Sequence, residues 1–226
     1  MGTGIIKNLK FLKECLLSVI YASEQKCIVC NKELYNDRFI CSECREDIKL
    51  CKNAFCIKKD GMRYEVYSAA YYSKTVMELI ISLKYKNNFD SGRLLASYMI
   101  NIIKLNNIQF DYITYVPMTK ASLKDRGYNQ SKYISKIISD EIDIPVINCL
   151  KKIKSTKDQI GLGGVQRWAN MKDSFKYIAR YDIEGKNILV IDDVITTGAT
   201  AYYCAEQLTI NGARKVSILT AAKSRV

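Results

Sequence analysis

One stretch of the sequence decides the fold, ILVIDDVITTGAT at residues 188–200. Its first four residues are apolar without polar alternation, which is typical of a strand in a parallel sheet that is covered on both faces. Asp192 and Asp193 follow where we expect this strand to end. A Thr-Thr-Gly-x-Thr turn then leads into residues 199–210, whose composition predicts a helix. Because ligands of open α/β sheets bind at the carboxyl ends of strands, the stretch predicts a binding site.

The residue types in this stretch suit a sugar phosphate. Backbone N–H groups and threonine hydroxyls of residues 196–200 can surround a phosphate at a helix start, and Gly198 allows the backbone to approach it closely. Asp192 and Asp193 can accept hydrogen bonds from sugar hydroxyls or contact a metal-bound ligand. The alternative is an ordinary strand–turn–helix in which a threonine caps the helix. The sequence contains neither a Walker A loop nor a G-x-G-x-x-G motif.

The same stretch resembles the phosphoribosyl-pyrophosphate (PRPP) loop of type I phosphoribosyltransferases at every position. The resemblance implies that Asp192 and Asp193 hold the ribose 2′- and 3′-hydroxyls, with Mg²⁺ accompanying PRPP. It also implies that the turn binds the 5′-phosphate through Thr196, Thr197, Gly198, Ala199 and Thr200. Catalysis does not follow directly, because some members of that family bind PRPP only to sense it.

Composition narrows the classes of partner and chemistry. The formal net charge is +12, with 35 basic and 23 acidic residues. Such an excess favours phosphorylated ligands or nucleic acid, although a lysine-rich solvated surface gives the same count. The sequence has no histidine, so an acid–base step has to use a carboxylate, lysine, tyrosine, cysteine or the substrate itself.

Two C-x-x-C pairs predict a zinc site. Cys27-Ile-Val-Cys30 and Cys41-Ser-Glu-Cys44 are separated by ten residues, and each pair offers two thiolates to one tetrahedral Zn²⁺. The linker is shorter than the usual span of roughly 15–20 residues, but a hairpin of this length can still return the second pair. Buried or redox-active thiols are the alternative.

The remaining cysteines are of two kinds. Cys51 and Cys56 are either a decayed second pair or free thiols, whereas Cys15, Cys149 and Cys204 lie in apolar patterns that indicate core positions. Nine cysteines without an export signal favour a reducing cytoplasm.

The sequence divides into three parts. Residues 1–24 have apolar residues at helical spacing, interrupted by lysines that exclude a stable membrane insertion, so we expect an amphipathic helix docked on the protein rather than on a membrane. Residues 25–60 form the four-cysteine zinc-binding subdomain. Residues 61–226 form an α/β domain, predicted as a type I phosphoribosyltransferase-like parallel sheet with flanking helices.

Within this domain, residue patterns predict a strand or hairpin arm over 64–72, helices over 74–84 and 91–104, a strand over 111–116, a helix around 133–138 and a last strand over 215–221. The basic turn that begins at Lys84 faces either a ligand or solvent, and we favour solvent.

Two further segments carry candidate site residues. The loop over residues 117–130 gathers Lys120 and Arg126 between a strand end and a helix start, where they could receive pyrophosphate, although a plain basic surface loop fits too. Residues 154–171 contain three glycines and few apolar anchors, which indicates either an ordinary disordered loop or a mobile segment able to close over a ligand with Arg167. Lys120, Arg126 and Arg167, with the two aspartates, are the candidate catalytic residues.

The order of these parts resembles the ComF competence proteins over nearly the whole chain. The resemblance rests on residues 188–200 and on Cys27, Cys30, Cys41, Cys44, Pro117, Arg126, Gly127, Tyr128, Asn129, Gln130, Thr156, Gln159, Arg167 and Asn170. Some relatives carry a further cysteine pair, where this chain has only Cys51 and Cys56. The family implies cytoplasmic handling of incoming single-stranded DNA.

Two functions follow as hypotheses. The first is a phosphoribosyltransferase that releases pyrophosphate from Mg²⁺-bound PRPP. The second is a non-catalytic adaptor that senses PRPP or a nucleotide, binds single-stranded DNA and contacts a DNA-uptake helicase.

Overall fold

The computed structural model describes residues 26–34, 39–154 and 164–224. The helix predicted over residues 1–24, together with Cys15, Thr156 and Gln159, lies outside the described residues. Among the described helices, none has the length and apolar character that crossing a membrane requires.

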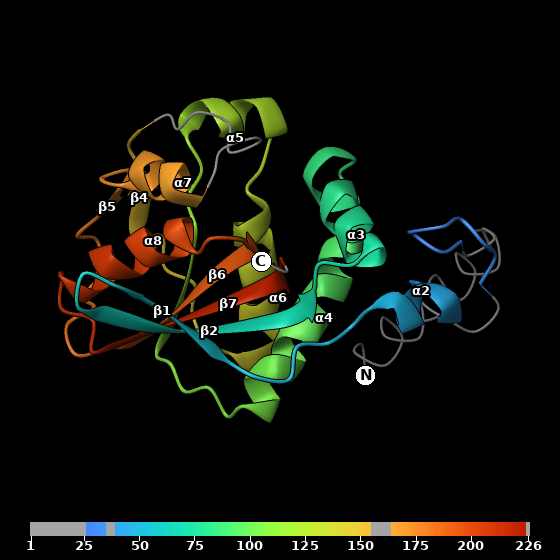
Figure 1. Ribbon diagram of the computed structural model, residues 1–226, viewed down its shortest axis with the longest axis horizontal. Coiled ribbons are helices and arrows are strands. Elements are labelled where there is room, and N and C mark those ends of the chain that lie inside the picture. Colours follow the sequence, from blue (N-terminus) through green and yellow to red (C-terminus); the bar gives the residue numbers. More distant parts are fainter. Residues whose placement is uncertain (1–25, 35–38, 155–163, 225–226) are drawn as a thin grey trace, which may run out of the picture.

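A five-stranded sheet forms the centre of the domain (Figure 1), in the order β1-β2-β7-β6-β3. Strands β2, β7, β6 and β3 are parallel, and β1 pairs with β2 as an antiparallel hairpin. Strands β4 and β5 form a separate antiparallel pair. The strands comprise β1 (Phe55–Lys59), β2 (Met62–Tyr71), β3 (Tyr112–Tyr115), β4 (Leu150–Lys152), β5 (Phe175–Tyr177), β6 (Asn187–Ile195) and β7 (Lys215–Lys223).

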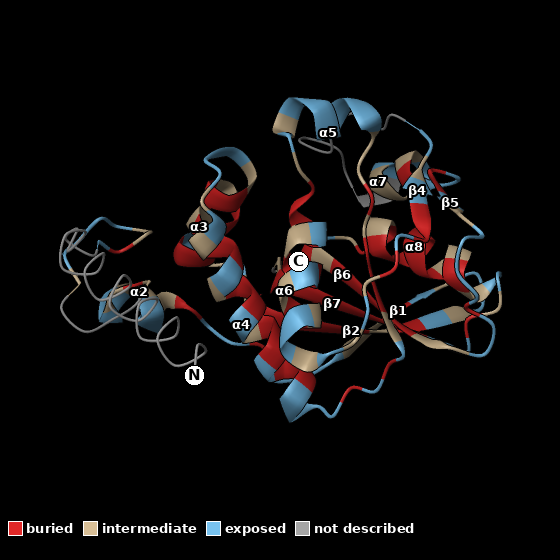
Figure 2. Cartoon of the chain, turned by 180° about the vertical axis from the view of Figure 1, so that it is seen from behind, coloured by how far each residue is buried: buried red, intermediate tan, exposed pale blue. Residues whose placement is uncertain are grey.

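Helices cover both faces of this sheet, which confirms the predicted α/β class. One face carries α3 (Lys74–Tyr85), α4 (Phe89–Leu105) and α6 (Gln130–Ile142), and the other carries α8 (Ala199–Thr209) with α7 (Gly164–Met171). Leu189 and Ile191 are buried against the first group, whereas Ile188 and Val190 are buried against the second. The buried residues accordingly run through the sheet on both sides (Figure 2), as the unbroken apolar run indicates.

Strand β6 is longer than the sequence indicates. We expect it to end before Asp192, but it continues to Ile195, so both carboxylates lie inside the strand. The reason is the neighbouring strand, because β7 also continues and pairs Asp192 with Thr220 and Val194 with Ala222. The turn over residues 196–198 follows, and α8 begins at Ala199 as predicted.

Two segments predicted as loops contain helices. Residues 120–126 form α5 (Lys120–Arg126), whose start is capped by Thr119 Oγ1 accepting from Ser122 N at 3.1 Å, and Gly127 ends the helix at φ +80°. Residues 164–171 form α7, because Trp168 packs edge-on against the rings of Tyr202 and Tyr203 of α8, with centroid distances of 5.4 and 5.9 Å. These aromatic contacts anchor α7 on α8, which the glycine-rich sequence of this segment does not indicate.

The cysteine-containing segment packs on the side of the domain that carries α3 and α4. It includes α2 (Ser42–Asp47), and its Cys27, Ile40 and Ile48 belong to the same buried cluster as α3 and α4. Asp47 Oδ2 accepts from Thr75 N at 2.9 Å, at the start of α3. The four-cysteine segment therefore supports the helix that leads to the candidate site.

Gly198 is predicted to be indispensable for packing at the start of α8. It has φ +82°, and a Cβ added there would lie 2.5 Å from Ile57 Cδ1. Gly61 has φ +79° with open space around it, so Gly61→Ala isolates the backbone cost of about 1–2 kcal/mol. Gly198→Ala should lower the free energy of unfolding in urea by about 1 kcal/mol more than this control, because of the added clash. Equal losses would show that Ile57 yields without cost.

Candidate functional site

A cleft of about 500 Å³ opens at the carboxyl ends of β3 and β6. Strand β6 contributes Asp192 and Asp193, and the turn and first residues of α8 contribute Thr196 and Thr200. Basic side chains reach it from three other elements, α3, α5 and β4: they are Lys84, Arg126 and Lys152. The cleft thus brings together the two aspartates, the threonine turn and one of the cations that the sequence singles out.

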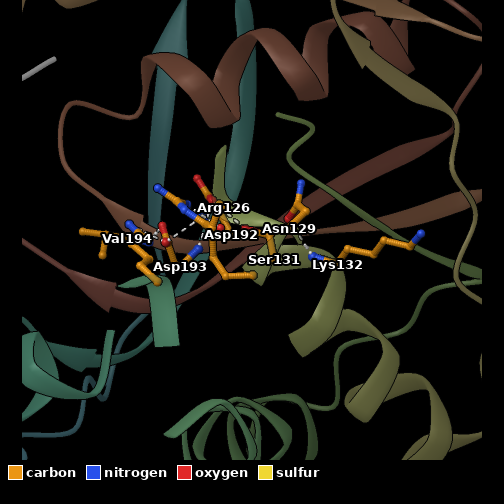
Figure 3. A network of polar contacts seen from close by, with 9 residues as sticks. Arg126, Asn129, Ser131, Lys132, Asp192, Asp193 and Val194 are labelled. Carbon is orange, nitrogen blue, oxygen red and sulfur yellow. Dashed lines mark hydrogen bonds and ion pairs between the residues drawn. The ribbon is translucent and has the colours of Figure 1, made fainter. Parts of the chain in front are cut away.

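Asp193 is the centre of a polar network (Figure 3). It is only 5% exposed, and its Oδ2 contacts Lys84 Nζ at 2.5 Å and accepts from Gln130 Nε2 at 3.0 Å. Its Oδ1 accepts from the backbone N–H of Val194 at 2.7 Å. Burial lowers the pKa of the Lys84 ammonium, but the Asp193 carboxylate outweighs this and raises that pKa above its ordinary value. A charged pair therefore joins α3 to β6.

Arg126 belongs to this network through Gln130. Arg126 Nη1 donates to Gln130 Oε1 at 2.7 Å, and its guanidinium lies 5.1 Å from the ring centroid of Tyr85. Gln130 occupies the first position of α6, whose start is fixed by Asn129 Oδ1 accepting from Lys132 N at 2.9 Å. Asn129 is thus the N-cap of α6, and Arg126 is held at the rim of the cleft.

Asp192 has different surroundings. Its Oδ1 accepts from Ser131 Oγ at 3.1 Å and from the N–H of Asp193 at 2.9 Å. No described residue donates a hydrogen bond to its Oδ2. Burial, and then the adjacent Asp193 carboxylate, raise the pKa of Asp192 to about 7. Lys152 lies in the same cleft, where burial lowers the pKa of its ammonium. Asp192 is therefore the carboxylate with an oxygen available to a ligand.

The threonine turn has the local geometry that suits an anion. Gly198 is the N-cap of α8 and makes no side-chain cap hydrogen bond, and Thr197 Oγ1 accepts weakly from Ala199 N at 3.5 Å. The first N–H groups of a helix and its dipole favour an anion at this end. Thr196 and Thr200 line the cleft beside these groups. Gly198 also allows the turn to pack closely against Ile57, because a side chain at this position would meet Ile57.

The structure distributes the other predicted residues differently. Lys120 begins α5 and lines a neighbouring groove instead of the cleft, although Arg126 on the same short helix reaches the cleft. Arg167 lies on α7 and does not line the cleft either. The solvent-facing interpretation of Lys84 is wrong, because its ammonium pairs with buried Asp193.

The sequence patterns do not predict Ser131 or Lys152 as residues of the site, and they include Gln130 only as part of the motif before α6. The position of Gln130 and Ser131 directly after a basic loop, at a helix start, is a signal that could have identified them. Lys152 has no such signal, because its short strand is not recognisable as part of a site.

The four predicted zinc ligands form one cluster. The Sγ atoms of Cys27, Cys30, Cys41 and Cys44 all lie within 4.8 Å of one another, and those of Cys30 and Cys41 are 3.6 Å apart. Tetrahedral ligands at a Zn–S distance of about 2.3 Å place sulfurs about 3.8 Å apart. The arrangement therefore fits a single structural metal ion bound by four thiolates.

Cys51 and Cys56 do not join this cluster. Cys51 is buried and its N–H donates to Ala69 O, while Cys56 lies on β1 with Arg63 Nε 3.1 Å from its Sγ. Of the two alternatives, free thiols describe them better than a second metal-binding pair. Cys149 and Cys204 are buried core residues, as predicted.

The chain is similar in sequence to known proteins. No protein-family model matches the chain. Over 221 residues it is 25% identical to Competence protein F of Haemophilus influenzae, and the alignment covers 93% of this chain and 95% of that protein. The chain is similar to Competence protein F over nearly its whole length. It is also 25% identical over 202 residues to the DNA utilization protein YhgH of Escherichia coli, and that alignment covers 85% of this chain and 87% of YhgH.

Among solved structures, adenine phosphoribosyltransferase from Thermoanaerobacter pseudethanolicus is similar over 80% of this chain and 98% of its own, with 12% identity and a TM-score of 0.42. A likeness at this TM-score says nothing about the residues of the site.

Removing one partner of the Lys84–Asp193 pair should destabilise the fold. Lys84→Met leaves a buried carboxylate without its cation, and we expect a loss of about 3 kcal/mol in the free energy of unfolding. Lys84→Met/Asp193→Asn should recover more than half of that loss. Lys86→Met, at an exposed lysine of the same turn, is the matched control. Urea unfolding of all four proteins measures this, and equal stability of the two single Met variants would contradict a buried pair.

Metal analysis should find about one Zn²⁺ per chain, bound by the four clustered thiolates. Cys44→Ser is expected to lose the metal, and Cys56→Ser to retain it. Substitution with Co²⁺ should give thiolate charge-transfer absorption in the wild type and in Cys56→Ser only. Zinc retained at full occupancy in Cys44→Ser would contradict the four-thiolate site.

Proposed function

We propose that the cleft binds PRPP with Mg²⁺, and that the protein serves the uptake of single-stranded DNA. The observation that carries the first part is that the start of α8, whose N-cap residue is Gly198, lies with Thr196 and Thr200 at the same cleft as Asp192. A phosphate subsite beside a carboxylate matches the two ends of a ribose 5-phosphate. The proposed 5′-phosphate ligands are the N–H and hydroxyl groups of residues 196–200.

The two aspartates have unequal roles in this proposal. Asp193 is engaged by Lys84, Gln130 and the backbone, so it contributes chiefly by fixing the floor of the cleft. Asp192 Oδ2 is proposed to accept from a ribose hydroxyl or to contact Mg²⁺ through water. Because Asp192 has a pKa near neutrality, binding of a cation such as Mg²⁺ beside it favours its ionised form.

Cations in the cleft would hold the leaving group. Arg126 and Lys152 both line it, and we propose that they contact the pyrophosphate together with Mg²⁺. In a transfer reaction the bond from C1′ to the pyrophosphate oxygen breaks, an acceptor nucleophile bonds to C1′, and the electron pair leaves with pyrophosphate. Positioning and charge stabilisation dominate such a step, which suits a chain without histidine. Lys120 and Arg167 would take part only if they approach the cleft.

The role in DNA uptake is supported by the relatives, whose names are Competence protein F and DNA utilization protein. We propose that the protein works in the cytoplasm, with a four-cysteine zinc-binding subdomain followed by a phosphoribosyltransferase-like domain that includes β1. A helicase partner belongs to the second candidate, a PRPP-sensing adaptor without turnover. The net charge of +12 favours contact with a nucleic acid in either case.

A calorimetric titration of PRPP with and without Mg²⁺ tests the proposal. Binding is expected with Mg²⁺, and its affinity should rise as the pH rises through about 7, because the ionised carboxylate of Asp192 attracts the Mg²⁺ that accompanies PRPP. Asp192→Asn should weaken binding by about tenfold or more and remove the part of the pH dependence that is not due to PRPP itself. Asp182→Asn, at an exposed aspartate, is the control.

The outcomes separate the candidates. No binding under any condition would refute the proposal. Binding of PRPP without release of its pyrophosphate in the presence of any of a panel of bases and amines would leave the sensing adaptor as the function.

A further inference from the structure

A second hollow, the basic groove, lies beside the cleft and takes no part in the proposed PRPP site. Its volume is about 730 Å³, and it shares Pro117 and Met118 with the cleft. It is lined by residues at the start of α6, by Tyr115 of β3, by Leu150 of β4 and by Ile178 after β5. The groove therefore runs along the β3 edge of the sheet.

Cations line the groove from several elements. Lys132 and Lys136 are exposed and lie one turn apart on α6, so both project on the same side of that helix. Lys120 of α5, Lys151 of β4 and Arg180 after β5 complete the set. Of the described residues that line the groove, none is acidic. Several cations from different elements, with no carboxylate among the described lining residues, fit an extended polyanion better than a single small anion.

Aromatic rings stand at one end of the same groove. Phe89 is 43% exposed, and its ring centroid lies 5.3 Å from that of Tyr128 and 5.0 Å from that of Tyr133. Tyr133 and Tyr128 are half-buried and hold Phe89 in place, and Tyr133 Oη donates to the carbonyl of Phe89 at 3.3 Å. An exposed ring fixed beside lysines offers a stacking surface next to phosphate contacts.

From these two observations we infer that the basic groove binds single-stranded nucleic acid. The phosphates contact Lys132, Lys136 and the other cations that line the groove, and a base stacks on Phe89. A duplex is a poor occupant because its bases are already stacked on one another and cannot present a face to Phe89. The inference rests on the proposed function for the use of the bound strand in uptake, and it adds the surface on which the strand lies.

The phosphate contacts are tested by fluorescence anisotropy with a short labelled oligothymidylate. Lys132→Gln/Lys136→Gln should weaken binding at low salt by about tenfold or more and reduce the slope of log Kd against log salt by about 1.4, the value for two phosphate contacts on a single strand. Lys52→Gln/Lys58→Gln removes the same charge at exposed positions, with Lys58 on the opposite edge strand β1. This control should bind nearly as the wild type does.

The stacking contact is tested separately. Phe89→Ala should weaken binding by about 5- to 150-fold, as expected for the loss of one base–aromatic stack. Phe89→Trp should retain affinity, and its added fluorescence should change when the strand binds. Circular dichroism and thermal melting establish that each variant is folded. If Phe89→Ala does not fold, the change in fluorescence of Phe89→Trp on strand binding still tests the stacking contact.

Each outcome is decisive. Equal losses in the two double-lysine variants, or no loss in either Lys132→Gln/Lys136→Gln or Phe89→Ala, would overturn the inference. Weaker binding of a duplex than of a strand supports it, and a comparison with oligouridylate shows whether the sugar matters. The affinity of Lys132→Gln/Lys136→Gln for PRPP should match that of the wild type, because the groove is separate from the cleft. If the wild-type protein binds the strand but not PRPP, only the proposed PRPP site is refuted.

Discussion

The ion pair between Lys84 and Asp193 is the constraint on which the site depends. A carboxylate inside a central strand is costly to bury unless a cation and hydrogen bonds accompany it. Lys84 supplies the charge from the end of α3, while Gln130 and the N–H of Val194 complete the hydrogen bonds. Three elements that are distant in sequence therefore meet at one carboxylate. Gln130 extends the link to Arg126, which places a guanidinium at the rim of the cleft.

This arrangement makes two adjacent aspartates chemically distinct. Asp193 is committed to the protein, whereas Asp192 keeps an oxygen toward the cleft and has its pKa raised to about 7 by burial and by Asp193. In the proposed PRPP site, a carboxylate of this kind attracts a cation and a hydroxyl donor, and the start of α8 favours a phosphate. The basic groove adds further cations next to the same cleft.

Local patterns predict much of this structure. The apolar run at residues 188–191 predicts a strand buried on both faces, and the C-x-x-C pairs predict the sulfur cluster, because both depend on residue type and spacing alone. The length of β6 is different, since its last residues are ordered by pairing with β7. Lys84 has the sequence context of a solvated lysine, and only the packing of α3 against the sheet reveals its buried partner. Lys120 and Arg126 look equivalent in sequence, but a short helix separates them onto different hollows.

A structure of the protein crystallised with PRPP and Mg²⁺ tests the central claim most directly. The account predicts the 5′-phosphate at the start of α8 on residues 196–200, the ribose hydroxyls or the metal ion facing Asp192, and an intact contact between Lys84 and Asp193. PRPP bound elsewhere, or bound in the cleft with Lys84 released from Asp193 and the phosphate away from α8, would contradict it.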